Sequence, residues 1–223
     1  MIPYQDIQKT RHFPFVTILL ILINASVFAY QLLLPPPGSN RLLYEFAVIP
    51  LEFKRGGNLP FSMGPIPIVT TFTSLFLHGG ILHLIGNMLY LWIFGDNVED
   101  RLGPVRFLIF YTLCGIIASF TQVYANFNSE IPMVGASGAI AGVLGGYLWI
   151  APKAKVKVLI PVFYFLRTAI LPAWIVLVGW ALIQFLHVQL APPNASGGIG
   201  YYAHIGGFVA GLLLLPAFRR RRR

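Results

Sequence analysis

The sequence predicts an all-α, polytopic membrane protein with six membrane-spanning helices in one domain. Hydrophobic residues make up 57% of the 223 residues and charged residues only 10%, whereas ordinary globular chains are roughly 45–50% apolar and about 25% charged. The mean hydropathy is +0.73. The charges are also clustered, so they leave long charge-free intervals, and an interval of about 20 residues is enough for a helix to cross a bilayer. These observations favour a membrane protein over a soluble domain.

The first charge-free interval follows Lys9 and Arg11. Its length and its bulky Tyr30-Gln31-Leu32 end favour a retained span over a cleaved signal peptide. Prolines and glycines interrupt the second interval before residue 77, and the last interval is divided by the Pro- and Gly-rich residues 192–198. The fourth span is short for a full crossing. The predicted spans are residues 13–34, 77–95, 107–125, 137–151, 168–191 and 200–218.

Two connections between spans have unusual composition. Residues 35–76 are too long and too apolar for an ordinary or disordered loop, so we expect a folded loop that is partly embedded in the membrane. Between the fourth and fifth spans, Lys153, Lys155 and Lys157 alternate with apolar residues. This pattern predicts a segment at the membrane interface rather than a seventh crossing.

Charge asymmetry predicts the orientation of the spans. With both termini inside, 13 of the 16 basic residues lie on the inner side, and only Arg41, Lys54 and Arg55 lie outside. The positive-inside rule therefore favours cytoplasmic N- and C-termini. It also explains the net charge of +9 by topology and anionic lipid, so nucleic acid is not an expected partner. No transit peptide is evident, which favours a prokaryotic plasma membrane.

Polar residues inside apolar spans are costly and therefore mark candidate functional positions. Spans two, four and six run in the same direction, so distance from the start of each helix measures depth from the outer face. His83 and Asn87 lie near the start of span two, Ser137 opens span four, and His204 lies about one turn into span six. These four side chains are predicted to share the outer part of the membrane.

Small residues predict that spans four and six touch. Gly200, Gly207 and Gly211 lie on the helical face that carries His204, and span four offers Gly138, Gly142 and Gly145. Small residues on facing helices let their backbones approach closely in lipid. Such a contact would bring the Ser137 hydroxyl within hydrogen-bonding distance of the His204 imidazole.

A hydroxyl next to a neutral imidazole is the minimum that nucleophilic catalysis requires. The N–H groups at the start of span four could bind the resulting oxyanion, and His83 and Asn87, one turn apart on one face, could add donors. Taken singly, Ser137 could be a helix cap and His204 a partner in a helix–helix hydrogen bond. The shared depth of Ser137 and His204, together with the predicted contact between their helices, favours catalysis over these two structural roles.

At these motifs the sequence resembles the rhomboid family of intramembrane serine proteases. The similarity covers most of the chain and includes His78-Gly79-Gly80-Ile81-Leu82-His83-Leu84-Ile85-Gly86-Asn87, Val98-Glu99-Asp100-Arg101-Leu102-Gly103, Gly135-Ala136-Ser137-Gly138-Ala139 and Ala203-His204-Ile205-Gly206-Gly207. The resemblance implies a six-helix rhomboid-like bundle with Ser137 as nucleophile, His204 as general base, and His83, Asn87 and the Ser137 backbone stabilising the oxyanion. Gly135, Gly138, Gly200, Gly207 and Gly211 are expected to support helix packing. The implied substrates are transmembrane proteins, which would enter near spans two and five.

The sequence departs from that family at two positions. A Trp-Arg pair common in the first loop is replaced by Val69-Thr70. A Tyr that stacks on the histidine in some members is replaced by Ala141, which leaves open how His204 is oriented.

Other functional classes fit less well. The single Cys114 excludes disulfides and multi-cysteine zinc sites, and Leu84 after His83 excludes a His-Glu-x-x-His metalloprotease. Neither a metal nor another cofactor is therefore expected. A non-enzymatic transporter or channel-like protein is the alternative, but it would need more polar residues toward the inner side, which spans four and six lack. No pattern specifies an oligomeric state.

Overall fold

A computed structural model describes residues 1–57, 66–162, 165–190 and 200–219. Most of them are helical. In chain order the helices are α1 Phe15–Leu33, α2 Pro36–Phe46, α3 Pro50–Arg55, α4 Pro67–Thr73, a 3-10 turn Ser74–Phe76, α5 Ile81–Leu102, α6 Pro104–Ala125, α7 Ser137–Ile150, α8 Ala173–Leu190 and α9 Tyr201–Phe218. The strands are β1 Ile2–Asp6, β2 Lys155–Val162 and β3 Phe165–Pro172.

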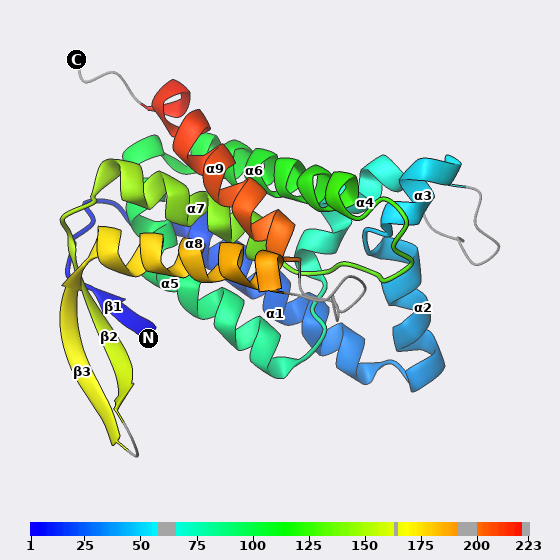
Figure 1. Cartoon of the computed structure of the whole chain (residues 1–223), viewed down its shortest axis with the longest axis horizontal. Helices are drawn as coiled ribbons and strands as arrows, with labels where there is room; N and C mark the ends of the chain where they lie inside the picture. The colour runs from blue at the N-terminus through cyan, green and yellow to red at the C-terminus, as the bar shows by residue number, and fades with distance from the viewer. Residues whose placement is uncertain (58–65, 163–164, 191–199, 220–223) are drawn as a thin grey trace.

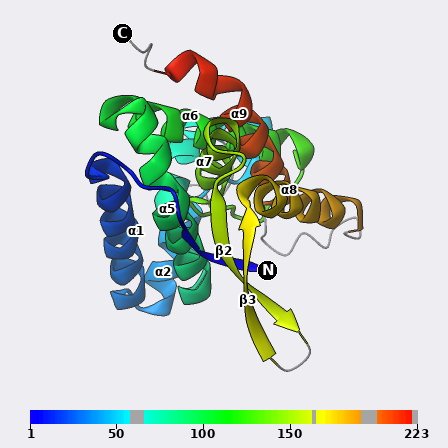
Figure 2. The ribbon, with the colours of Figure 1, turned by 90° about the vertical axis from the view of Figure 1, so that its left-hand side faces the viewer.

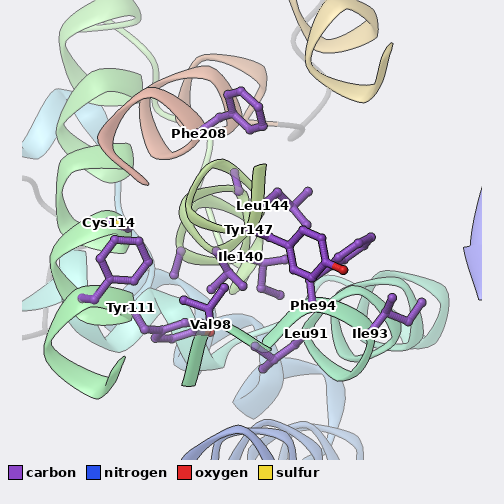
Figure 3. Close-up of a cluster of buried hydrophobic side chains, with 14 of the residues drawn as sticks. Leu91, Ile93, Phe94, Val98, Tyr111, Cys114, Ile140, Leu144, Tyr147 and Phe208 are labelled. Carbon is purple, nitrogen blue, oxygen red and sulfur yellow. The ribbon is translucent and has the colours of Figure 1, made fainter. Parts of the chain in front are cut away.

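Helix α7 occupies the centre of the bundle (Figure 1), where α5, α6 and α9 surround it. Every residue from Gly138 to Tyr147 is buried. Figure 3 shows Ile140, Leu144 and Tyr147 of α7 among apolar side chains of α5 and α6. Tyr147 packs edge-on against Phe94, with their ring centroids 5.0 Å apart. This core fixes the position of the first residue of α7, Ser137.

Glycines determine the contact between α7 and α9. A Cβ atom on Gly207 would overlap the carbonyl oxygen of Gly138, and one on Gly211 would overlap that of Gly142. On the facing helix, a Cβ atom on Gly145 would overlap the carbonyl oxygen of Phe208. Each glycine inside a helix costs roughly 1 kcal/mol relative to alanine, so the close packing of the two backbones must offset this loss.

The predicted helical membrane fold is confirmed at the level of helix length and composition. In the described part of the chain, α1, α6, α8 and α9 are each long and apolar enough to cross a membrane. The pair formed by Pro67–Phe76 and α5 also qualifies together, with a bend of 83° between its parts, and α7 is a shorter apolar helix. The six predicted spans correspond to α1, α5, α6, α7, α8 and α9, whereas Pro67–Phe76 belongs to the predicted embedded loop.

The boundaries of two spans differ from the prediction. Helix α5 begins at Ile81 rather than residue 77 and continues through its charged end to Leu102. Its buried Glu99 accepts hydrogen bonds from the backbone N–H groups of Val16 and Thr17, both at 2.8 Å, and from the Thr17 hydroxyl. The carboxylate therefore satisfies free donors at the start of α1, which explains how the charge is tolerated at this junction.

The second difference is a small antiparallel sheet in the order β1-β2-β3. Residues 168–172, expected in the fifth span, belong to β3, and α8 begins only at Ala173. Lys155 and Lys157, expected at a membrane interface, lie on β2. Figure 2 shows that the β2–β3 hairpin extends beyond the helices. Helix α8 is thus shorter than the predicted fifth span, because the first residues of that interval belong to β3.

Strand β1 is held to the bundle by Asp6. Its Oδ2 accepts hydrogen bonds from the Tyr147 hydroxyl at 2.9 Å and from Asn97 Nδ2 at 2.8 Å. Burial raises the pKa of Asp6 to about 6. The sheet is therefore joined to α5 and α7 through a polar cluster at the end of the bundle opposite α2, α3 and α4 (Figure 1).

The predicted loop of residues 35–76 is folded, because α2, α3, α4 and the 3-10 turn occupy its described part. Val48 and Met133 join it to the α6–α7 connection by two backbone hydrogen bonds of 2.8 and 3.0 Å. Some predicted features lie outside the described residues: the break at 192–198, the last residue of the fifth span, and the basic residues 220–223.

Candidate active site

Ser137 and His204 are brought together by the close contact of α7 and α9. Ser137 Oγ lies 2.8 Å from His204 Nε2. Ser137 is the first residue of α7, and His204 lies in the first turn of α9. Both side chains are half-buried. A hydroxyl that shares a hydrogen bond with an imidazole nitrogen can lose its proton to that nitrogen as it attacks an electrophile.

His83 and Asn87 lie beside Ser137 on one face of α5. His83 lies in the first turn of α5, because the helix begins at Ile81 and not at residue 77 as predicted. The backbone N–H of Gly79 lies 3.5 Å from His83 Nδ1, an arrangement that leaves Nε2 to carry the proton. The first N–H groups of α7 have no partner within their own helix. His83, Asn87 and Ser137 line the same cavity.

Asn87 is held in place by the segment that precedes α5. Its Nδ2 lies 2.9 Å from Nε2 of the buried His78. The backbone N–H and C=O of His78 pair in turn with the Gln31 side chain of α1, at 3.1 and 3.2 Å. The imidazole of His78 therefore accepts a hydrogen bond from Asn87, and its backbone joins this segment to α1. The Asn87 amide has a second N–H that can serve another acceptor.

The candidate site residues line a cavity of about 770 Å³. His83, Asn87, Ser137 and His204 form one side of it, and α2 contributes Asn40, Leu43 and Tyr44. A smaller space of about 210 Å³ continues from the same four side chains toward Tyr90 and Trp180. Both spaces adjoin the Ser137 hydroxyl, and the larger one has a volume typical of ligand sites, which is roughly 300–1,000 Å³.

Two of the five glycines expected in helix packing have other positions. Gly135 precedes α7 with a φ of 120°, and a Cβ atom there would lie 2.8 Å from His83 Nε2. It leaves room for the His83 ring. Gly200 is the N-terminal cap residue of α9 and faces Met133 rather than α7. Gly138 adjoins Ala118 of α6 and contacts Gly207 through its carbonyl oxygen.

Comparison with known proteins identifies the family. The Rhomboid domain model matches residues 67–221, which is more than half of the chain. This chain belongs to the rhomboid family. It is therefore an integral membrane protein of a family that includes serine proteases. The matched region contains the starts of α5, α7 and α9, from which the four site residues come.

Several relatives of this rhomboid chain are similar over much of its length. Rhomboid protease GluP of Bacillus subtilis is 34% identical over 145 residues, which cover 65% of this chain and 25% of the relative. RHOMBOID-like protein 1 of Arabidopsis thaliana is 26% identical over 227 residues, covering 91% of this chain and 52% of the relative. RHOMBOID-like protein 4 of the same plant is 34% identical over 144 residues, covering 62% and 31%. The matched regions therefore span between a quarter and about half of these relatives.

Two residues of this rhomboid's site were not predicted from the sequence. Gln184 of α8 contacts His204 Nδ1, and the Trp180 ring lies 5.7 Å from the His204 ring. The sequence did contain a signal for Gln184, because an amide in an apolar, charge-free interval is costly unless it has a partner. The same argument had selected Asn87. Nothing in the sequence, however, shows which helix Gln184 faces.

Proposed function

We propose that this rhomboid is an intramembrane serine endopeptidase that cleaves transmembrane or juxtamembrane segments of other membrane proteins. The observation that carries the proposal is the 2.8 Å contact between Ser137 Oγ and His204 Nε2, made beside a cavity and next to side-chain N–H donors. Membership of the rhomboid family supports it, as does the relative named as a protease.

The proposed reaction proceeds through an acyl-enzyme. Ser137 Oγ attacks the carbonyl carbon of the scissile peptide while His204 Nε2 accepts the hydroxyl proton. The tetrahedral intermediate collapses when the C–N bond breaks, and His204 returns the proton to the leaving amine. A water molecule then attacks the ester carbonyl, with His204 again accepting a proton. The Ser137 oxygen leaves with that proton, which restores both side chains.

The oxyanion of each tetrahedral intermediate would be stabilised by Asn87, His83 and the backbone N–H groups at the start of α7. Donors that are already oriented toward the developing charge contribute more than mobile water does. The N-terminus of α7 also carries the positive end of its helix dipole. The backbone donors require no particular side chain, whereas His83 and Asn87 can be tested by substitution.

We expect Asn87→Ala to lower kcat by roughly 10- to 100-fold with little change in KM, because one of several oxyanion donors is lost. His83→Ala should have an effect of similar size. The measurement is steady-state cleavage of a transmembrane reporter, with the melting temperature of each variant as control. Complete inactivity of Asn87→Ala together with a large drop in melting temperature would indicate that Asn87 acts mainly through its contact with His78.

The proposed location is a prokaryotic plasma membrane, with both termini cytoplasmic and the cavity toward the outer side. The inner side would then hold 13 of the 16 basic residues, in accord with the positive-inside rule. In the structure, β1 and the β2–β3 hairpin lie at one end of the bundle, and α2, α3 and α4 at the other (Figure 1). The helices that supply the site begin toward the second end.

A fluorophosphonate probe tests the proposed chemistry. It reacts with a serine whose hydroxyl is activated by a base: the Oγ–P bond forms and fluoride leaves. We expect labelling of the folded protein in a bilayer to map to Ser137 and to be lost in His204→Ala and after heat denaturation. Labelling at another residue, or unchanged labelling in His204→Ala, would contradict the proposal. A transporter or channel has no need of an activated serine and would remain unlabelled.

A further inference from the structure

The second ring nitrogen of His204 has a partner on a different helix. While Nε2 faces Ser137 Oγ, Nδ1 lies 2.8 Å from Oε1 of Gln184. An amide oxygen only accepts hydrogen bonds, so this contact requires a proton on Nδ1. The neutral ring then has its lone pair on Nε2, where it can accept the proton of Ser137. The geometry on both sides of the ring is consistent with this one tautomer.

Gln184 is placed for this contact by α8. The buried residues of this helix are Ala173, Val176 and Leu177 near its start and Gln184 further along. The neighbouring Ile183 and Phe185 are 45% and 50% exposed. An amide that is buried away from water costs free energy unless it is hydrogen-bonded. The His204 ring supplies the partner, which accounts for a polar side chain pointing inward from an apolar helix.

Trp180 supports the same arrangement. It lies one turn before Gln184 on α8, and its ring is tilted by 42° to the His204 ring, with centroids 5.7 Å apart. Trp180 also contacts the Phe208 ring of α9. Two side chains of α8 therefore hold His204, one through its Nδ1 and the other against its ring. These two contacts account for the orientation of His204, which the sequence left open because Ala141 stands where some family members have a stacking tyrosine.

We propose that Gln184 is a positioning residue that fixes the Nδ1–H tautomer and the orientation of His204. This inference rests on the proposed proteolytic function. Gln184 does not touch the reacting atoms, and it acts through the imidazole. A neutral amide cannot stabilise the imidazolium as a carboxylate does, so its main effect is to keep Nε2 free for Ser137. The alternative is that the contact between Gln184 and His204 only stabilises the packing of α8 against α9, with no effect on the tautomer.

The test compares Gln184→Leu and Gln184→Glu in the full chain in nanodiscs, with a transmembrane reporter. Leucine has similar size without an acceptor, and we expect kcat to fall about 10- to 100-fold while KM changes less than about twofold. Glutamate keeps an acceptor oxygen and should restore most of the turnover. Gln189→Leu is the matched control, because Gln189 is an exposed glutamine on the same helix, and it should behave as wild type.

The spectroscopic readout is the ¹⁵N NMR signal of His204, assigned by its loss in His204→Ala. At mildly alkaline pH we expect the wild type to carry the proton on Nδ1 and Gln184→Leu to show a mixture of tautomers. A wild-type ring protonated on Nε2 would overturn the inference without any variant. So would a Gln184→Leu protein with wild-type kcat and an unchanged tautomer. If Ser137 is not labelled by the fluorophosphonate, the proposed function itself fails, whatever the tautomer.

Discussion

Ser137→Ala is expected to lower cleavage of a transmembrane reporter by roughly four to six orders of magnitude, to the level of the uncatalysed background. The variant lacks the oxygen that forms the acyl-enzyme, and no neighbouring group can replace it at 2.8 Å from His204 Nε2. The protein should remain folded, because only a half-buried hydroxyl is lost. The measurement is single-turnover cleavage with enzyme in excess.

Ser26→Ala is the matched control for this substitution, since Ser26 is an exposed serine on α1. It should cleave at the wild-type rate. His204→Ala should be nearly as inactive as Ser137→Ala, and the double variant should be no worse than either, because the two residues act as one unit. Turnover by Ser137→Ala that matches the wild type would remove Ser137 from its assigned role.

Gly211→Ala is expected to have the largest effect on stability. Its added methyl group would overlap the carbonyl oxygen of Gly142 on α7, and a backbone atom cannot move aside as a flexible side chain can. Separating α7 from α9 would also pull Ser137 away from His204. We expect a loss of about 3 kcal/mol or more, measured as a lower midpoint of unfolding in detergent, together with loss of fluorophosphonate labelling.

Gly86→Ala provides the control for Gly211→Ala. Gly86 lies inside α5, and no atom lies within 4 Å of the position that its Cβ would take. The change should therefore leave stability unaltered or raise it by up to about 1 kcal/mol, the helix preference of alanine over glycine. Equal midpoints for the two variants would show that the α7–α9 contact tolerates a methyl group and is looser than its geometry indicates.

The sequence predicted the helices through the distribution of charge. The intervals 107–125 and 200–218 lie close to α6 and α9, because a charge-free interval of about 20 residues is the length that one spanning helix needs. It did not predict the end of α5, because the charged residues after position 95 ended the charge-free interval before the helix itself ends at Leu102. The Glu99 carboxylate is buried because it satisfies donors of α1, and a pairing between residues so far apart in the chain leaves no local signal.

The sheet was missed for a related reason. Lys155-Val156-Lys157-Val158 alternates with the period of a strand, but its partner β1 lies at the start of the chain. The other partner, β3, is apolar enough to be mistaken for the beginning of a helix. At the site, Ser137, His83, Asn87 and His204 could be grouped by depth alone. Gln184 could not, because its role depends on which way α8 is rotated.

The one cysteine of the chain, Cys114, is fully buried and packs against Gly142 at the centre of the bundle. Thiol reagents therefore should not reach it in the folded protein. A cysteine introduced at Leu186, which is 52% exposed on α8, would then be the sole site for a spin label or fluorophore without removal of the native thiol. Movements of α8 during turnover could be followed in this way on an otherwise unaltered chain.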